Sequence, residues 1–250
     1  MNKNSQVIVS VVTIVYNEVN EIEKTIESII NQDFKNFELI VIDGGSNDGT
    51  QTLIEKYKDK ITYFLSEKDS GIYDAMNKGL KVCNGSWVNF MNAGDKFYNH
   101  SVLSNVFNKN TSLEQFSLVY GYKYVNGVKT LPKELEVLRK GDIMANHQSM
   151  FFNRVKIGKE LIYSLKYPIY GDYELVNRIY MLFGKESFFY HDSAIAIYAG
   201  GGISSVVSWQ KRKDKFKIIF RTYGIAGVIK SLIYSKFNVR KFRNYIKKQL

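Results

Sequence analysis

Short apolar runs alternate with helical patterns through residues 8–91, and this alternation constrains the fold more than any other feature. The helical patterns begin after Asn17, which we expect to cap the first helix, and near Thr50 and Asp74. Strands that alternate with helices form parallel sheets with right-handed crossovers. We therefore expect an α/β fold with a mostly parallel sheet and helices on both faces. The apolar runs that predict its strands cover residues 8–15, 37–42, 61–65 and 87–91.

Polar residues follow three of these runs, at the point where each predicted strand ends. They occupy residues 16–18, 43–48 and 92–95. Ligands of open parallel sheets bind beyond the carboxyl ends of the strands, so we expect the site there. The sequence contains no phosphate-binding P-loop motif, and no Gly-x-Gly-x-x-Gly motif follows the first strand. A P-loop enzyme is therefore excluded, and a dinucleotide site is not expected.

The second half of the chain is less regular. Residues 99–205 mix short predicted strands at 118–124, 186–190 and 194–198 with a helix at 173–183. One Cys and three His exclude a disulfide framework and a multi-Cys zinc site.

The net charge of +11 is concentrated at one end of the chain. Residues 206–250 carry a net charge of +12, whereas the rest carries −1. A nearly neutral body with a basic tail points to a surface-seeking segment, and nucleic-acid binding is not expected. Because basic residues alternate with apolar and aromatic ones, we expect amphipathic helices that lie on an anionic membrane leaflet. Helices packed on the body or on a second copy, in a homo-oligomer, are the alternative.

Two features bear on the compartment. The apolar run at residues 7–15 follows a single Lys and precedes no small-residue cleavage site, so a buried strand is favoured over a signal peptide. No run of ~18 uncharged apolar residues predicts a transmembrane helix. We expect a cytoplasmic protein, peripheral on the cytoplasmic face of the inner membrane.

Four segments in order carry a resemblance to a known family: VSVVTIVYNE (residues 9–18), ELIVIDGGSNDGT (38–50), SEKDSGIYDAMNKG (66–79) and WVNFMNAGD (87–95). Together they resemble the family 2 glycosyltransferases, inverting enzymes of bacterial polysaccharide assembly with the Rossmann-like GT-A fold. The resemblance implies a nucleotide-sugar-binding half at residues 1–98 and an acceptor-binding, catalytic half at residues 99–205. Basic amphipathic C-terminal helices then occupy residues 206–250.

The resemblance implies a pocket for a nucleotide-sugar donor, of which a UDP-sugar is our first expectation. Tyr16 can stack on the base, and Asp43 can accept hydrogen bonds from the base edge or ribose. The alternatives are a rim aromatic for Tyr16 and a turn-building carboxylate for Asp43; Asp48 is expected to be a turn and cap residue. The implied donor-binding residues are Thr13, Tyr16, Glu18, Asp43, Asp74, Lys78, Asn92 and Ala93.

The family binds Mn²⁺ or Mg²⁺ through an acidic motif at the end of the fourth strand. Here that motif reads Asn92-Ala93-Gly94-Asp95, and only Asp95 carries a charge. Asp95 is therefore the implied metal ligand, with donor phosphates completing the coordination. His191 is a candidate further ligand, and a surface position is its alternative.

An inverting transfer needs one base to take the proton of the acceptor hydroxyl. The resemblance implies that this base is Asp172, in the sequence Gly171-Asp172-Tyr173-Glu174. An ordinary helix N-cap is the alternative for Asp172, and Glu174 is the alternative base. His147 and Gln148 are implied to contact the acceptor, although His147 could equally be a buried structural residue. Gly200-Gly201-Gly202 is expected to form a closing loop or a plain turn.

The predicted function is thus a metal-dependent inverting glycosyltransferase that acts on a glycan or polyprenyl-diphosphate-linked acceptor in capsule, lipopolysaccharide or exopolysaccharide synthesis. A non-catalytic sugar-nucleotide-binding protein, a nucleotidyltransferase and a basic peripheral membrane or RNA-binding protein are the alternatives.

Overall fold

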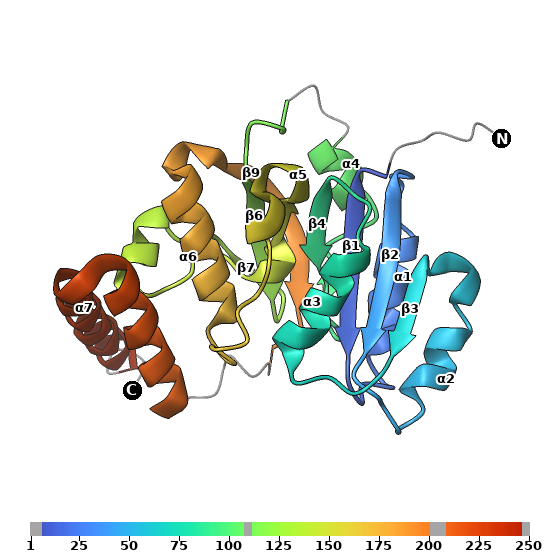
Figure 1. The fold of residues 1–250 in the computed structure, drawn as a ribbon, viewed down its shortest axis with the longest axis horizontal. Helices are drawn as coiled ribbons and strands as arrows, with labels where there is room; N and C mark the ends of the chain where they lie inside the picture. Colours follow the sequence, from blue (N-terminus) through green and yellow to red (C-terminus); the bar gives the residue numbers. More distant parts are fainter. Residues whose placement is uncertain (1–6, 108–111, 201–208, 247–250) are drawn as a thin grey trace.

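The computed structural model describes residues 7–107, 112–200 and 209–246, with side chains as far as Ser235. Its first half is the predicted alternation of strands and helices (Figure 1). β1 lies between β2 and β4 and is parallel to both, and β3 extends the sheet beyond β2, also in parallel. The elements are β1 (Val9–Val15), α1 (Ile22–Ile30), β2 (Phe37–Asp43), α2 (Thr50–Glu55), β3 (Tyr63–Ser66), α3 (Ile72–Val82) and β4 (Trp87–Phe90).

The second half continues the same sheet with mixed strand directions. The strand order is β3-β2-β1-β4-β8-β6-β9-β5, with β7 beside β6. β8 is antiparallel to both β4 and β6, whereas β6 and β9 are parallel. The expected α/β sheet is thus confirmed: its first half is parallel, and its less regular second half mixes parallel and antiparallel pairs. These strands are β5 (Lys96–Phe97), β6 (Leu118–Val125), β7 (Val128–Thr130), β8 (Met150–Asn153) and β9 (Phe188–Tyr198).

β9 also corrects the sequence prediction, because it is one continuous strand where two short ones were expected. It shares register shifts with β6 between Tyr120 and Lys123, so the irregular pattern of its residues reflects a local bulge. The remaining helices are α4 (Val102–Phe107), α5 (Arg154–Ile157) and α6 (Gly171–Phe183), and short 3₁₀ helices span Lys58–Lys60, Leu135–Lys140, His147–Ser149, Gly158–Glu160 and Lys185–Ser187.

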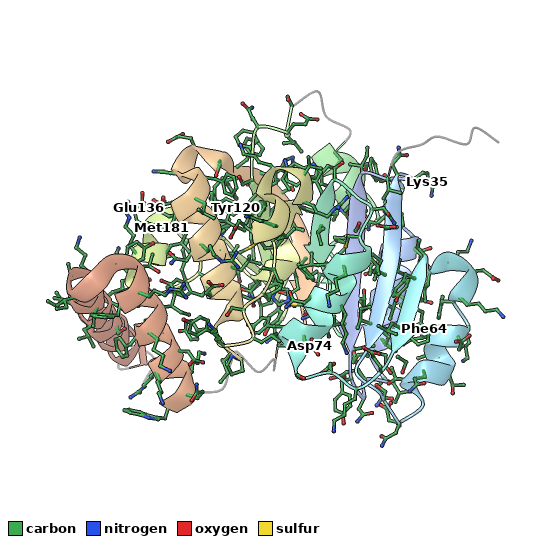
Figure 2. The ribbon with its side chains drawn as sticks, viewed as in Figure 1. Lys35, Phe64, Asp74, Tyr120, Glu136 and Met181 are labelled. Carbon is green, nitrogen blue, oxygen red and sulfur yellow. The ribbon has the colours of Figure 1, made fainter. Side chains whose placement is uncertain are left out.

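Helices cover both faces of the sheet, as expected. α3 and α6 bury Met76 and Leu175 in one apolar core, and α1 and α4 bury Ile26 and Leu103 in a second core. The sheet separates the two cores, since neighbouring residues of β1 such as Val11 and Val12 belong to different ones. In Figure 2, Asp74 lies at the lower end of α3. Because both halves share these cores, the end of the parallel strands is held rigidly against the second half.

α7 (Trp209–Ile246) is a helix pair rather than one straight helix. Gly224 interrupts it with φ of 63°, a left-handed conformation that glycine adopts without strain. The first segment buries Ile218 and Ile219 in the protein core. In the second segment, Gly227 and Ser231 are buried. Within the described part of the chain, no helix is long and apolar enough to cross a membrane.

Candidate active site

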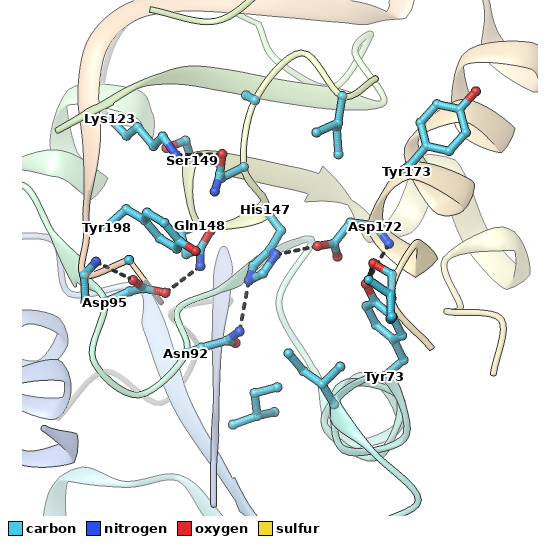
Figure 3. A pocket seen from close by; sticks show the side chains of 18 of the residues that line it. Tyr73, Asn92, Asp95, Lys123, His147, Gln148, Ser149, Asp172, Tyr173 and Tyr198 are labelled. Carbon is cyan, nitrogen blue, oxygen red and sulfur yellow. Dashed lines mark hydrogen bonds and ion pairs between the residues drawn. The ribbon is translucent and has the colours of Figure 1, made fainter. Parts of the chain in front are cut away.

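A cavity of about 810 Å³ opens at the carboxyl ends of β1 and β4 and continues into the second half of the molecule (Figure 3). Eight of the residues that were predicted to form the site line it, although they come from four distant parts of the sequence. They are Tyr16, Glu18, Asn92, Ala93, Asp95, His147, Gln148 and Asp172. The other five predicted residues, Thr13, Asp43, Asp74, Lys78 and His191, do not line this cavity.

The loop after β1 presents Tyr16 to the cavity rim, where 62% of its side chain is exposed. An added Cβ on Gly44 would lie 2.5 Å from Asp69 and 3.3 Å from the Tyr16 ring, so glycine permits this close approach. Asn17 has φ of 51° and does not cap α1, contrary to the sequence prediction; its side chain instead accepts a hydrogen bond from the Asn47 amide. The loops after β1 and β2 are thereby joined beneath Tyr16.

Asp43 is fully buried and lies beneath the same loops. Its carboxylate accepts hydrogen bonds from the backbone amides of Gly45 and Ser46 and from the hydroxyls of Ser46 and Ser66. These contacts match the turn-building alternative, and a direct contact of Asp43 with a donor stays a prediction. Thr13 is likewise fully buried in β1.

Asp74 and Lys78 hold the loop that follows β3 rather than the cavity itself. Lys78 forms an ion pair of 2.8 Å with Glu67, and Asp74 accepts a hydrogen bond from the Ser70 amide. This loop carries Asp69, which does line the cavity beside Tyr16. Asp69 was not singled out from the sequence, although it stands within the third motif.

Asp95 lies deep in the cavity and is 5% exposed. Its Oδ1 accepts a hydrogen bond from the Ala199 amide (3.0 Å), and its Oδ2 accepts one from Gln148 Nε2 (2.5 Å). Burial raises the pKa of Asp95 although both hydrogen bonds favour the carboxylate. Gln148, predicted to contact the acceptor, is thus bonded to the predicted metal ligand.

The predicted metal motif offers a single carboxylate, that of Asp95, as a ligand for a cation. Within residues 7–107, 112–200 and 209–235, no three His, Cys, Asp or Glu side chains gather where they could hold a metal ion by themselves. His191 Nδ1 lies 2.7 Å from the Ser193 hydroxyl, away from the Asp95 set. Each Asp95 oxygen accepts one hydrogen bond and retains a second lone pair, and Mg²⁺ sites commonly combine one or two carboxylates with substrate phosphates. Asp95 therefore fits a site that the diphosphate of a bound nucleotide would complete.

Three side chains form a hydrogen-bonded row along the cavity. The Asn92 side-chain amide lies 3.0 Å from His147 Nε2, and His147 Nδ1 lies 2.9 Å from Asp172 Oδ2 (Figure 3). Burial opposes protonation of the imidazole, but the adjacent Asp172 carboxylate outweighs it, so the pKa of His147 is raised above its usual value. The replacement of the family's first acid by Asn92 places an amide next to this histidine. His147 is therefore both buried, as the alternative had it, and directed at the predicted base.

Asp172 is held in the first turn of α6 and does not cap it. The helix begins at Gly171, its N-cap position is Tyr170, and no side chain caps it. The Asp172 backbone amide donates a hydrogen bond to the Tyr73 hydroxyl at 3.2 Å. The simple N-cap alternative is thus wrong, because the carboxylate is turned toward His147.

Glu174 points elsewhere. It forms an ion pair with Arg178 one turn along α6, at 3.2 Å, and it does not line the cavity. Its contacts therefore do not favour the alternative assignment of the base.

Other cavity residues were not predicted from the sequence. Tyr73 stands within the third motif, but no role was assigned to it there. Lys123, Asn146 and Tyr198 stand in no motif, because the second half approaches the first only in the folded chain. Residues 201–208, which include most of the expected glycine-rich closing loop, lie outside the described residues.

A cavity at this edge of the sheet, lined by residues of the first, third and fourth motifs, agrees with the comparison to known families. Residues 10–162 match the model of glycosyl transferase family 2, which is more than half of the chain. The chain belongs to this family. It is similar to an uncharacterized glycosyltransferase of Mycobacterium tuberculosis, with 29% identity over 177 residues and 68% of each chain covered. It is also similar to a PGL/p-HBAD biosynthesis glycosyltransferase of Mycobacterium bovis, with 28% identity and 73% of each chain covered.

Solved structures confirm the GT-A fold of this glycosyltransferase. S. aureus TarS 1–349 in complex with UDP-GlcNAc superposes with a TM-score of 0.66 at 16% identity, covering 94% of this chain and 73% of that one. Glucosyl-3-phosphoglycerate synthase from Mycobacterium tuberculosis, solved with Mn²⁺ and UDP, gives a TM-score of 0.62 at 19% identity, covering 87% and 80%. At these identities the likeness concerns the fold.

Proposed function

We propose that this glycosyltransferase moves a sugar from a nucleotide-sugar donor to an acceptor hydroxyl with inversion, in a single displacement. The observation that carries the proposal is that Asp95 and Asp172 line one cavity and are held by consecutive residues, Asp95 by Gln148 and Asp172 by His147. A carboxylate at each place supplies a metal ligand and a base without a nucleophilic side chain. The rim at Tyr16 and Asp69 would receive the nucleotide.

Asp172 is the proposed general base. Its carboxylate would accept the proton of the acceptor hydroxyl as the oxygen attacks the anomeric carbon. His147 fixes the position of this carboxylate through the 2.9 Å contact, and Asn92 fixes the imidazole in turn. The row Asn92-His147-Asp172 thus orients the base before the substrates arrive, which lowers the cost of reaching the reactive geometry.

Asp95 is the proposed protein ligand of Mn²⁺ or Mg²⁺, together with the donor diphosphate. A divalent cation there would supply charge stabilisation to the departing diphosphate. Gln148 and the Ala199 amide hold the Asp95 carboxylate in place. Two structures of similar fold were solved with Mn²⁺, one together with GDP-Man and one together with UDP, which supports this choice of ion.

A thermal-shift panel tests the proposal. We expect one of UDP-, GDP- or dTDP-sugars, at about 100 times its dissociation constant with Mn²⁺ present, to raise Tm by about 5 °C or more, since such saturation stabilises a fold by about 2.7 kcal/mol. A UDP-sugar is the first expectation because two similar folds were solved with UDP or UDP-GlcNAc. Omission of Mn²⁺ should reduce the shift. No shift with any donor would contradict the proposal, and a shift without donor hydrolysis or transfer would indicate a non-catalytic binder.

We further propose that the acceptor is a glycan or a polyprenyl-diphosphate-linked sugar of surface polysaccharide synthesis, and that α7 holds the enzyme on an anionic membrane leaflet. The segment after Gly224 packs Val228 and Tyr234 against the body and buries the small residues Gly227 and Ser231, but its other face exposes four large aliphatic side chains. A helix that only packs on a soluble body would carry polar side chains on that outer face. Near the exposed stripe, Lys and Arg can contact lipid phosphates. The stripe consists of Ile225, Ile229, Leu232 and Ile233, which are 45–69% exposed.

Replacement of Ile225, Ile229 and Ile233 by Ser is expected to weaken binding to vesicles that contain anionic lipids, most strongly at high salt, where the charge attraction is screened over roughly 8 Å or less. Co-sedimentation across a salt series measures this. The triple Ser variant of Val155, Ile162 and Leu165, which are also exposed, is the matched control and should bind as the wild type does. Equal binding by both triple variants would contradict membrane insertion, and loss of a dimer in the first would favour a second copy as the partner.

Deletion of the whole tail is a poorer test than the sequence suggests. The first segment of α7 contributes Ile218 and Ile219 to the core, and Lys211 lines the cavity. Removing them would expose apolar surface and alter the site, so the surface variants separate membrane binding from folding.

A further inference from the structure

Lys123 is a half-buried lysine on β6 that lines the reactive end of the cavity. Its Nζ donates a hydrogen bond to Asn146 Oδ1 at 2.8 Å and lies 4.4 Å from the centre of the Tyr198 ring (Figure 3). Both neighbours are uncharged. The irregular register between β6 and β9 falls at this residue, and bulges of this kind often redirect a side chain beside an active site.

The contacts of Lys123 lie next to those of Asp95. Asn146 is two residues before Gln148, which binds Asp95 Oδ2, and Tyr198 precedes Ala199, whose amide binds Asp95 Oδ1. The charges of Lys123 and Asp95 act on one another, and Lys123 also acts on His147. Lys123 thus lines the same end of the cavity as the proposed metal ligand and the histidine that orients the base.

The charge of Lys123 is not neutralised by a carboxylate in contact with it. Lys133, another lysine of the cavity, forms an ion pair with Asp142 at 2.6 Å, and His147 is paired with Asp172. Among the described residues Lys123 forms no such pair, and burial lowers the pKa of its ammonium group. A half-buried cation with only neutral partners costs free energy, which an anionic ligand would offset.

We propose that Lys123 binds the distal phosphate of the donor, the one bonded to the sugar. This proposal rests on the proposed function, because it assigns Lys123 to the leaving group of that reaction. The acceptor oxygen forms a bond to the anomeric carbon while the bond from that carbon to the phosphate oxygen breaks. The electron pair leaves with the diphosphate, the acceptor proton goes to Asp172, and Lys123 remains protonated and donates a hydrogen bond to the phosphate.

The positive charge of Lys123 matters more here because the metal motif, residues 92–95, contains one acid, Asp95. One carboxylate attracts a divalent cation more weakly than two or three would, so less of the diphosphate charge is offset by a tightly held metal. A fixed ammonium group at the same place stabilises the departing charge without reorganisation, because the protein holds it there before the reaction.

Binding of UDP, GDP and dTDP, each compared with its monophosphate, tests the proposal in the absence of acceptor. For the diphosphate that the wild type binds most tightly, we expect Lys123→Met to weaken binding by about tenfold or more, the usual range for a hydrogen bond to a charged group. Binding of the corresponding monophosphate should change by less than about threefold. Lys123→Arg should recover most of the affinity, because it restores a cation.

Lys129→Met is the matched control, since Lys129 also lies over a tyrosine ring, 3.9 Å from the centre of Tyr122, but outside the cavity. It should bind diphosphates as the wild type does, and melting temperatures report whether each variant is folded. Equal affinity of wild type and folded Lys123→Met for the diphosphate would overturn the proposal, as would equal weakening for diphosphate and monophosphate, or an effect confined to the acceptor KM. Failure of the wild type to bind any diphosphate would instead overturn the proposed function, and this proposal with it.

Discussion

Asp172→Asn is expected to lower kcat by at least about 10²-fold while donor and metal binding are kept, because a general base contributes about 10² to 10⁴ in rate. The amide has the shape of the carboxylate and retains an oxygen that can accept the His147 Nδ1 hydrogen bond, so the fold should persist. The measurements are kcat with a soluble acceptor analogue and the Tm shift with the donor that the panel selects.

Glu174→Gln is the matched control for Asp172→Asn. It removes the other carboxylate of the same helix turn, which pairs with Arg178 outside the cavity. We expect near-normal kcat in this variant. The reverse result, an active Asp172→Asn enzyme and an inactive Glu174→Gln enzyme, would move the base to Glu174. If both variants remain active, α6 forms only the acceptor site.

Asp95→Asn is expected to abolish the Mn²⁺-dependent part of transfer, a loss on the order of 10²-fold or more, because the variant removes the one anionic ligand of the proposed metal site. Asn is preferable to Ala, since Asp95 is buried and its oxygens accept hydrogen bonds from Gln148 and Ala199. An oxygen of the Asn side chain can keep the bond to the Ala199 amide. Rates at several Mn²⁺ concentrations and the Mn²⁺-dependent Tm shift are the measurements.

Asp192→Asn serves as the control for Asp95→Asn, because Asp192 is exposed on β9, contacts the Tyr190 hydroxyl and does not line the cavity. Its metal dependence should equal that of the wild type. Metal-dependent turnover in Asp95→Asn comparable to that of the control would remove Asp95 from the metal site.

The parallel half of the fold could be predicted because its signals are local. Buried strands covered on both faces read as continuous apolar runs, and the intervening helices show their own periodicity, so β1 to β4 and their order of appearance follow from the sequence. The polar ends of β1 and β4 became cavity residues for the same reason, since carboxyl ends of parallel strands meet at one edge. Tyr16, Asn92 and Asp95 were found in this way.

Some residues that were predicted to bind the donor lie outside the cavity. They show that the local sequence pattern does not determine where a polar side chain points. Asp43 follows a strand end as Asn92 does, yet four hydrogen bonds turn it inward to hold the loop. Lys78 stands in a motif but pairs with Glu67. Which partner a polar side chain takes depends on groups that are distant in the sequence, and its spacing does not encode them.

The sequence by itself determined the family, the parallel half-sheet and the residue types at the strand ends, because these depend on periodicity and on motifs of consecutive residues. Only the tertiary structure decided that Asn92, His147 and Asp172 form one row, that Gln148 holds Asp95, and that Lys123 lines the same cavity. It also decided that α7 folds back at Gly224 with its aliphatic side outward. The physical reason is that these contacts join segments separated by 23 to 104 residues, whose approach is fixed by the packing of two cores against one mixed sheet.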